Sequence, residues 1–303
     1  MMEKVFQKFI SEVNEKQLFV EGVAIADEKK VLMEHRFVPD RPRDIYSHSK
    51  SYTSTAVGIA LAEGKLSLDD KLADYFPEYV PENPQPELLK ITLKHLLTMS
   101  SGFNHAYLMA ADRRAGVGVP DYLAYMMSRH IEVEPGTKFL YSSADTYLAG
   151  RMVTNATGKF LDVYLYDKLF SRLGQGYPVW EKCPQGHPVA ASGLYMKLTE
   201  MMKLGQLYLA DGMWNGERLV ESSWIREATG FQISPEAGGD VWKQGYGYQF
   251  WQPALPHAYS ASGAYGQLTV VLPDSGLAVG IQCPEYGDWN LVKPVFYQLL
   301  LQL

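Results

Sequence analysis

The sequence is poor in the residues that mark disulfide-rich and metal-binding proteins. Only two of its 303 residues are cysteines, Cys183 and Cys283, and they lie far apart in the chain. This spacing indicates neither a disulfide scaffold nor a zinc site, so we expect free buried thiols, although an exported protein could join the two. The seven histidines are scattered and form no His-Glu-x-x-His motif. We therefore expect no bound metal ion.

Long apolar runs are also missing. No segment is apolar enough to span a bilayer, and residues 1–22 alternate charged and apolar side chains without the apolar core of a signal peptide. We therefore expect a cytoplasmic protein without membrane contact. The net charge of −6 offers no basic surface for nucleic acid. The chain also lacks the Gly-x-Ser-x-Gly elbow of α/β-hydrolases and a phosphate-binding glycine loop.

The order of the predicted elements indicates an α/β fold of the α+β type. Strands are predicted at 18–25, 31–37, 245–251, 267–272 and 277–282. Helices are predicted at both ends of the chain, and the middle is mainly helix and loop. We therefore predict one antiparallel sheet flanked by helices, made by residues 1–66 and 189–303. Residues 67–188 would form an inserted helical lobe, with the active site in the cleft between the lobes.

One predicted helix, at 47–63, stands out because its interior is small and apolar nearly all round. Such a helix is expected in the middle of the molecule, and Gly64 follows where a left-handed residue ends a helix. Other helices or helix starts are predicted at 67–70, 92–95, 145–157, 198–209 and 291–301. Residues 102–121 have scattered glycine and charge, which predicts a mobile loop.

Ser47 and Lys50 begin the predicted central helix and could form a nucleophile and its base. Residues three apart share a helix face, so the Lys50 amine can lie beside the Ser47 hydroxyl. A serine hydroxyl needs such a base, and burial near a helix N-terminus favours the neutral amine. Taken alone, however, Ser-x-x-Lys is short and occurs by chance in many proteins, and a capping serine with a solvated lysine is the simpler explanation.

The surrounding sequence resembles a known family. Ser-x-x-Lys marks class A β-lactamases and penicillin-binding proteins. The matching blocks lie at 45–53, 63–70, 91–102, 134–143, 193–194, 204–209 and 263–267. In this order they resemble the class C β-lactamase-like serine hydrolases over nearly the whole chain. Within the penicillin-binding-protein/β-lactamase superfamily, the sequence of these blocks is most similar to the esterase and 6-aminohexanoate-dimer hydrolase branch.

The resemblance implies a mechanism and the residues that perform it. It implies an acyl-enzyme reaction without metal or organic cofactor, on a fold in which a mixed α/β lobe packs on a helical lobe. Ser47 would be the nucleophile, Lys50 its base, and Tyr141 the phenol that passes a proton to the leaving group. The backbone N–H groups of Ser47 and Ala264 would stabilise the oxyanion.

Two positions depart from the family pattern. Ser143 replaces the asparagine of the family's Tyr-x-Asn element, and its hydroxyl could serve part of that amide's role. The third element, usually Lys-Thr-Gly or His-Thr-Gly, is aligned with Ala261, Ser262 and Gly263, so its cation is missing. In β-lactamases that cation helps to hold the substrate carboxylate. Efficient β-lactam hydrolysis is therefore not expected.

Other side chains could line the cleft. His187 enters the second part of the sheet lobe, and Tyr107 and Trp251 are candidates for the substrate wall, as are Trp180 and Tyr248. For each of these aromatic residues taken singly, ordinary core packing is the simpler explanation. His48 is expected to pack or to make a supporting hydrogen bond rather than to transfer a proton.

These observations predict a serine hydrolase that cleaves a small-molecule ester or amide. The alternatives are a D-aminopeptidase or β-lactamase-type amidase and a catalytically silent binding protein of the same fold. Retention of Ser47, Lys50 and Tyr141 argues against the silent protein. The sequence makes no prediction of the acyl group or of the oligomeric state.

Overall fold

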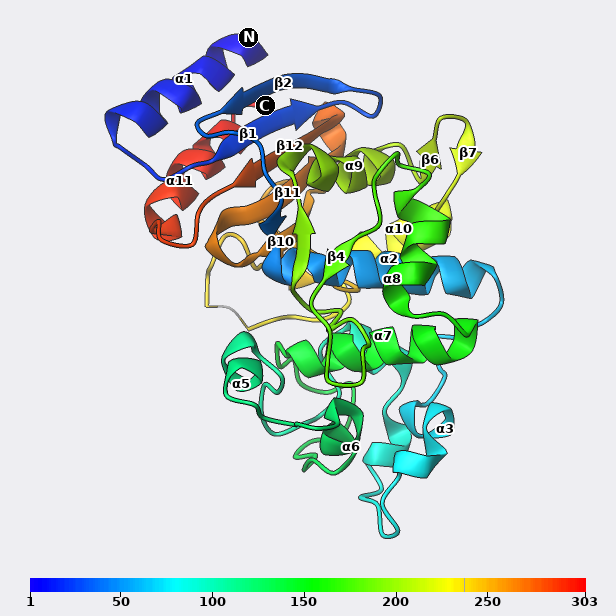
Figure 1. Ribbon diagram of the computed structural model, residues 1–303. Helices are drawn as coiled ribbons and strands as arrows, with labels where there is room; N and C mark the ends of the chain where they lie inside the picture. Colours follow the sequence, from blue (N-terminus) through cyan, green and yellow to red (C-terminus); the bar gives the residue numbers. More distant parts are fainter. Residues whose placement is uncertain (237) are drawn as a thin grey trace.

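Strands from both ends of the chain form one seven-stranded antiparallel sheet in the computed structural model, which describes residues 1–236 and 238–303 (Figure 1). The strand order is β2-β1-β12-β11-β10-β9-β8. The strands are β1 Gly22–Ala26, β2 Val31–Arg36, β8 Gly245–Tyr246, β9 Trp251–Gln252, β10 Tyr259–Gly263, β11 Gln267–Leu272 and β12 Leu277–Gln282. The predicted fold class is confirmed.

Helices cover both faces of this sheet, so β1, β11 and β12 are buried along their whole length. Helices α1 (Met2–Glu15) and α11 (Trp289–Leu300) cover one face, where Val23 and Ile25 contact their apolar sides. Helix α9 (Leu198–Leu209) covers the other face, where the small residues Ala24 and Ala26 point. The alternation of large and small residues along β1 therefore follows the two kinds of helix contact.

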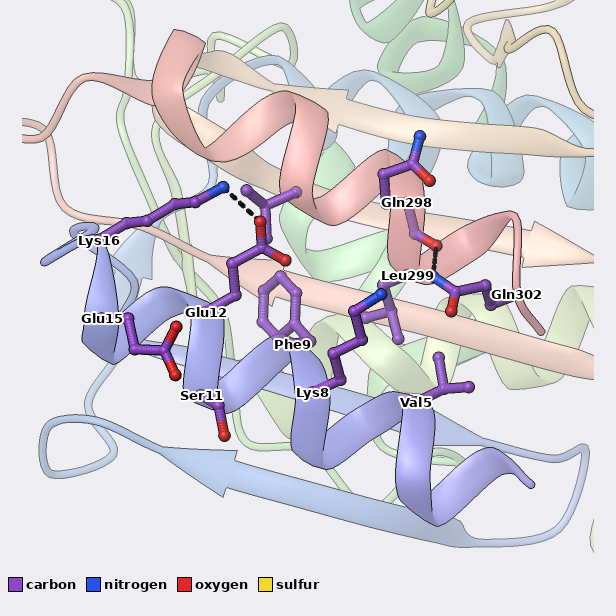
Figure 2. A pocket seen from close by; sticks show the side chains of 11 residues that line it. Val5, Lys8, Phe9, Ser11, Glu12, Glu15, Lys16, Gln298, Leu299 and Gln302 are labelled. Atoms are coloured by element: carbon purple, nitrogen blue, oxygen red, sulfur yellow. Dashed lines mark hydrogen bonds and ion pairs between the residues drawn. The ribbon is translucent and has the colours of Figure 1, made fainter.

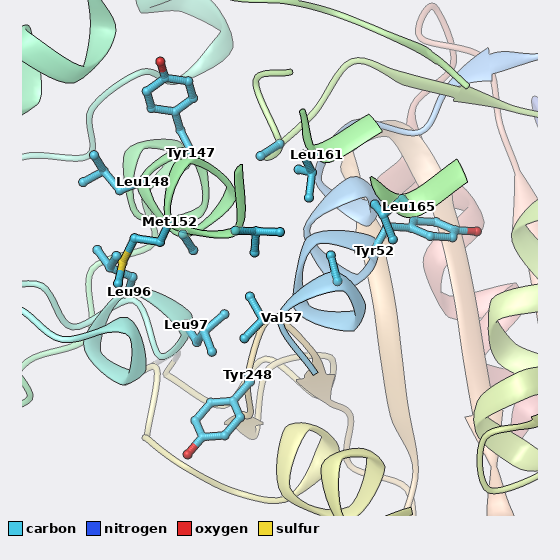
Figure 3. Packing of buried hydrophobic residues seen from close by; sticks show 14 of the residues in the cluster. Tyr52, Val57, Leu96, Leu97, Tyr147, Leu148, Met152, Leu161, Leu165 and Tyr248 are labelled. Carbon is cyan, nitrogen blue, oxygen red and sulfur yellow. The ribbon is translucent and has the colours of Figure 1, made fainter. Parts of the chain in front are cut away.

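Helix α2 (Ser49–Ala62) runs through the middle of the molecule, between the sheet and the helical part (Figure 1). Its side chains are buried from Ser49 to Ala60 because helices pack around it. Tyr52 and Val57 of α2 lie among apolar side chains of α7 (Ser143–Thr157) and α8 (Leu161–Leu165) in Figure 3. This packing fixes the position of the residues at the start of α2.

The remaining helices and strands are short. The helices are α3 Leu72–Tyr75, α4 Leu93–Leu97, α5 Ala110–Arg114, α6 Tyr122–Met127 and α10 Ser222–Thr229. Single turns lie at Tyr46–His48, Pro77–Tyr79, Leu88–Lys90, Tyr166–Phe170, Ala264–Gly266 and Pro273–Ser275. Two small sheets consist of β3 Arg43–Asp44, β5 Leu194–Met196 and β4 Val179–Trp180, and of β6 Met213–Trp214 and β7 Glu217–Arg218.

The predicted elements agree best with the structure where their periodicity is regular. The helix at 198–209 and the strands at 267–272 and 277–282 are confirmed with their ends. The predicted helix start at 67–70 is wrong. There, the Asp70 carboxylate accepts a hydrogen bond from the Ser67 amide in a turn, and the helix begins only at Leu72.

The strand predicted at 245–251 is also wrong in part. The chain folds back on itself between β8 and β9, which pair with each other, and Gln249 takes a φ of 66° in the connection. Strand β10 was not predicted. Both cysteines are free and buried, as predicted. Within the described residues, none of the helices combines the length and the apolar character needed to cross a membrane.

Candidate active site

Ser47 is the single residue between Ile45 and Ala60 that is not buried. It lies in the turn Tyr46–His48, directly before α2. The turn is held by Asp44, whose Oδ1 accepts hydrogen bonds from the amides of Tyr46 (2.7 Å) and Gly193 (3.1 Å). Tyr46 has a φ of 49°, a conformation that a non-glycine residue adopts at some cost. The surrounding contacts therefore hold Ser47 at the surface of an otherwise buried segment.

The end of strand β10 packs directly on this turn. A Cβ atom at Gly263 would lie 2.1 Å from the Ile45 carbonyl oxygen, so this position requires glycine. The close approach brings the backbone of Gly263 and Ala264 to the same cleft as Ser47. Two backbone N–H groups, those of Ser47 and Ala264, are thus available on neighbouring elements.

Lys50 lies behind Ser47, with its amine in contact with the hydroxyl. Its Nζ is 3.3 Å from Ser47 Oγ and donates a second hydrogen bond to the Ala191 carbonyl at 2.9 Å. The residue is 1% exposed. Burial and the nearby Arg113 lower the pKa of the Lys50 amine to about 7, although Asp145 acts in the opposite direction. A neutral amine is therefore accessible near neutral pH.

Tyr141, two residues before α7, completes the group. The Lys50 Nζ lies 5.0 Å from the centre of its ring. Trp251 flanks the same ring at a centroid distance of 5.4 Å. Burial raises the pKa of the Tyr141 phenol to about 12, with smaller opposing effects of the Ser47 and Trp251 side chains. The phenol therefore keeps its proton at neutral pH, as a proton donor must.

Two charged residues near Lys50 were missed by the sequence analysis. Arg113 of α5 is 6% exposed and donates to both oxygens of Glu181 (3.0 and 2.9 Å) and to Ser192 Oγ (2.6 Å). Through these contacts Arg113 connects the segment 102–121, which was predicted as a mobile loop, to Glu181 and Ser192. No sequence signal marked it, because its partners are remote in the chain.

Asp145 is the second missed residue. It lies in α7, one turn after Tyr141, and is 1% exposed. Its Oδ1 accepts a hydrogen bond from Ser101 Oγ at 2.9 Å, whereas its Oδ2 has no hydrogen-bond partner among the described residues. Burial raises the pKa of this carboxyl to about 7. The spacing of four residues from Tyr141 could have drawn attention to it.

Ser47 opens into a cleft of about 520 Å³. Its wall combines serine and backbone groups near the nucleophile with aromatic residues and two lysines. The lining residues are Ser47, Met109, Phe139, Tyr141, Pro235, Trp242, Lys243, Trp251, Ser260, Ser262, Gly263, Ala264, Leu268, Trp289 and Lys293. Of the predicted binding residues, Trp251, Ser262 and Gly263 therefore lie in this wall. A cleft of this volume accommodates a small organic substrate.

Four predicted wall residues lie elsewhere. Trp180 and Tyr248 are buried in the hydrophobic core. The Tyr107 ring packs against Phe103 and Tyr125, and its hydroxyl donates to Asn104 at 2.8 Å. Only its backbone serves the site, since its carbonyl accepts from the Ala144 amide at the start of α7. His187 packs against the Phe160 ring at 4.8 Å, away from the cleft. The predictions for Tyr107 and His187 fail because both side chains pack against neighbouring rings of their own region instead of facing the cleft.

The two departures from the family pattern also differ from expectation. The Ser143 hydroxyl contacts Met109 Sδ at 3.4 Å, and the carbonyl of Ala191 rather than this hydroxyl accepts from Lys50. Ala261 is 3% exposed and faces the core beneath α9, because side chains alternate along β10. Its neighbour Ser262 points into the cleft instead. The residue type at position 261 therefore does not determine the charge of the cleft.

His48 takes a supporting position. It is fully buried, and its Nε2 lies 3.0 Å from Thr269 Oγ1 on β11. Burial lowers the pKa of its imidazole to about 3, which leaves the ring neutral. It thus packs the start of α2 against the sheet.

A second hollow lies between α1 and α11 (Figure 2). It has a volume of about 430 Å³ and is lined by residues of both helices, where Lys16 pairs with Glu12. None of the predicted site residues lines it. Within the described part of the chain, no group of three or more His, Cys, Asp or Glu side chains could hold a metal ion.

Comparison with known proteins identifies the family of the chain. The Beta-lactamase family model matches residues 8–283. An Escherichia coli protein proposed to be a D-alanyl-D-alanine carboxypeptidase is 29% identical over 154 residues, 47% of this chain and 35% of its own length. The lovastatin esterase of Penicillium rubens is 33% identical over 156 residues, 44% of this chain and 39% of that protein. The chain thus matches little more than a third of the length of these relatives.

Solved structures show the same fold. A Bacillus anthracis protein proposed to be a 6-aminohexanoate-dimer hydrolase superposes with a TM-score of 0.81 at 18% identity, over 96% of this chain and 80% of that one. At this identity the likeness concerns the fold alone. The family model, in contrast, matches most of the sequence. The chain belongs to the Beta-lactamase family of serine hydrolases.

Proposed function

We propose that the protein hydrolyses small esters or amides through an acyl intermediate on Ser47. The observation that carries this proposal is the contact of 3.3 Å between Lys50 Nζ and Ser47 Oγ, at the one exposed point of a buried segment. The lowered pKa of the Lys50 amine supports its role as the base. A binding protein would need neither this contact nor a buried lysine.

In the proposed reaction, Lys50 takes the Ser47 proton as Oγ attacks the substrate carbonyl. The N–H groups of Ser47 and Ala264 stabilise the oxyanion, an effect of about 3–4 kcal/mol for one good donor. The proton then passes through Tyr141 to the leaving oxygen or nitrogen, and that bond breaks. In deacylation, Tyr141 and Lys50 accept a proton from water. The water oxygen attacks the acyl-Ser47 carbonyl, the bond to Ser47 Oγ breaks, and the acid is released.

The test uses p-nitrophenyl butyrate and a fluorophosphonate probe. We expect turnover of the ester and covalent labelling of the protein, both lost in Ser47→Ala. Ser143→Ala is the matched control, because this buried hydroxyl contacts only Met109 Sδ and should keep the labelling. The proposal fails if the wild-type protein neither turns over the ester nor is labelled at Ser47. A chromogenic cephalosporin assayed in parallel distinguishes an esterase from a β-lactamase.

A further inference from the structure

The charge of the cleft is opposite to that of the chain. The sequence has 34 acidic and 28 basic Asp, Glu, Lys and Arg side chains, a net charge of −6. The cleft lining, as far as the structure describes it, includes Lys243 and Lys293 but no aspartate or glutamate. A concave site with charge of one sign raises the local concentration of ligands of the opposite sign. The cleft therefore favours an anionic ligand.

Lys293 approaches from the side of the oxyanion-stabilising backbone. It follows Trp289 by four residues on α11, so both side chains are on one face of the helix and both line the cleft. The Trp289 ring packs on Gly266, two residues after Ala264, where a Cβ atom would lie 2.5 Å from the ring. The described side chains include no carboxylate within ion-pair distance of Lys293.

Lys243 lies beside the aromatic residues next to Tyr141. Its Nζ lies 5.6 Å from the centre of the Trp251 ring, and that ring flanks Tyr141. Its ion pair with Asp240 is long, at 3.7 Å, and both side chains are partly exposed. Such a pair contributes little and is easily exchanged for a better partner. Two cations from separate elements therefore converge on one cavity.

These lysines occupy the role that position 261 cannot fill, because Ala261 faces the core. The wall of the same cleft is apolar at Phe139, Trp251 and Leu268. An apolar wall with a few placed polar groups fixes the orientation of a bound molecule. A ligand with a carbonyl at one end and an anion at the other matches this arrangement.

We propose that Lys243 and Lys293 bind a carboxylate of the substrate, so that the preferred substrates are esters or amides that carry a free carboxylate remote from the scissile bond. This inference rests on the proposed hydrolysis at Ser47. The carboxylate lies either on the acyl chain or on the leaving group, and the two sources are separated by experiment. Either carboxylate would be held by charge-assisted hydrogen bonds from lysine.

The experiment compares kcat/KM for three esters. They are p-nitrophenyl butyrate, mono-p-nitrophenyl glutarate with its carboxylate on the acyl chain, and the butyrate ester of 4-hydroxybenzoate with its carboxylate on the leaving group. We expect the wild-type protein to prefer one of the two anionic esters, relative to the intrinsic reactivity of each in buffer. In Lys243→Gln/Lys293→Gln this preference should fall by about tenfold to a hundredfold. Lys90→Gln, remote from the cleft and paired with Glu134, should keep it.

A wild-type protein without preference for either anionic ester, or a double variant with an unchanged preference, would overturn the inference. A binding measurement on Ser47→Ala separates this failure from failure of the hydrolase proposal. Monomethyl glutarate and 4-hydroxybenzoate should each be titrated against the fluorescence of Trp242, Trp251 and Trp289, which line the cleft. If Ser47→Ala binds either anion, and the two lysine substitutions abolish that binding, the inference is supported even without turnover. Absence of binding of both, together with absence of turnover, overturns both proposals.

Discussion

The two walls of the cleft are built on different principles. On the wall that carries Ser47 and Lys50, polar groups are paired inside the protein: Lys50 with Ala191, Asp44 with the turn, and Arg113 with Glu181. A second part of the lining carries Lys243, from a loop, and Lys293, from α11. These groups of the first wall have partners inside the protein, whereas the two lysines are open to a ligand.

This difference separates the chemistry from the selection of substrates. A nucleophile and its base must be held in one geometry, which requires partners that do not leave with the product. A binding wall instead needs groups whose best partner is the substrate itself. Substitutions on the first wall should therefore alter the rate and its pH dependence for every substrate. Substitutions on the second wall should alter the ranking of substrates.

The largest effect is expected for Lys50→Met, which removes the base and keeps an unbranched side chain in the buried site. We expect kcat/KM to fall by about a hundredfold to ten-thousandfold for neutral and anionic esters alike, because a general base contributes that much. In the wild-type protein, kcat/KM should rise with pH through about 7, where Lys50 loses its proton. A pH–rate profile and circular dichroism of the variant check both points. A loss confined to anionic esters would contradict the division between the walls.

An intermediate effect is expected at Arg113, whose charge disfavours the protonated form of Lys50. In Arg113→Gln the pKa of Lys50 should rise, so the acid limb of the pH–rate profile should move to higher pH and activity at pH 6 should fall several-fold. Arg113→Lys keeps the charge but not the two-oxygen contact with Glu181. A shift in the glutamine variant alone identifies the charge as the cause. Equal shifts in both variants would show that the contact matters instead.

The two walls also differed in how far the sequence predicted them. Ser47 and Lys50 were found because a separation of three residues at a predicted helix start brings their side chains together, as the contact between Lys50 Nζ and Ser47 Oγ confirms. Regular periodicity likewise predicted α9 and β11. Gln249 illustrates what sequence periodicity misses. Its side chain bonds the Leu97 carbonyl and Thr146, so contacts remote in sequence fix the turn between β8 and β9. The cations of the binding wall arrive by the same kind of long-range packing, and no local pattern encodes them.

The smallest effect is expected at Asp145, and it should run opposite to that of Arg113. When ionised, this carboxylate favours the protonated form of Lys50. Asp145→Asn removes the charge and keeps an oxygen that can accept from Ser101. The pKa of Lys50 should therefore fall, and the acid limb should move to lower pH.

The matched control is Asp162→Asn, because Asp162 is equally buried in α8 but pairs with Lys182, away from the cleft. This control should leave the acid limb in place, whatever it does to stability. If Asp145→Asn instead moves the limb to higher pH, Lys50 does not titrate as the base that limits the reaction. If neither variant moves it, the charge of Asp145 does not reach Lys50. Opposite shifts at Arg113 and Asp145 would show that the internally paired wall sets the protonation of its base from two sides, independently of which substrate the lysine wall selects.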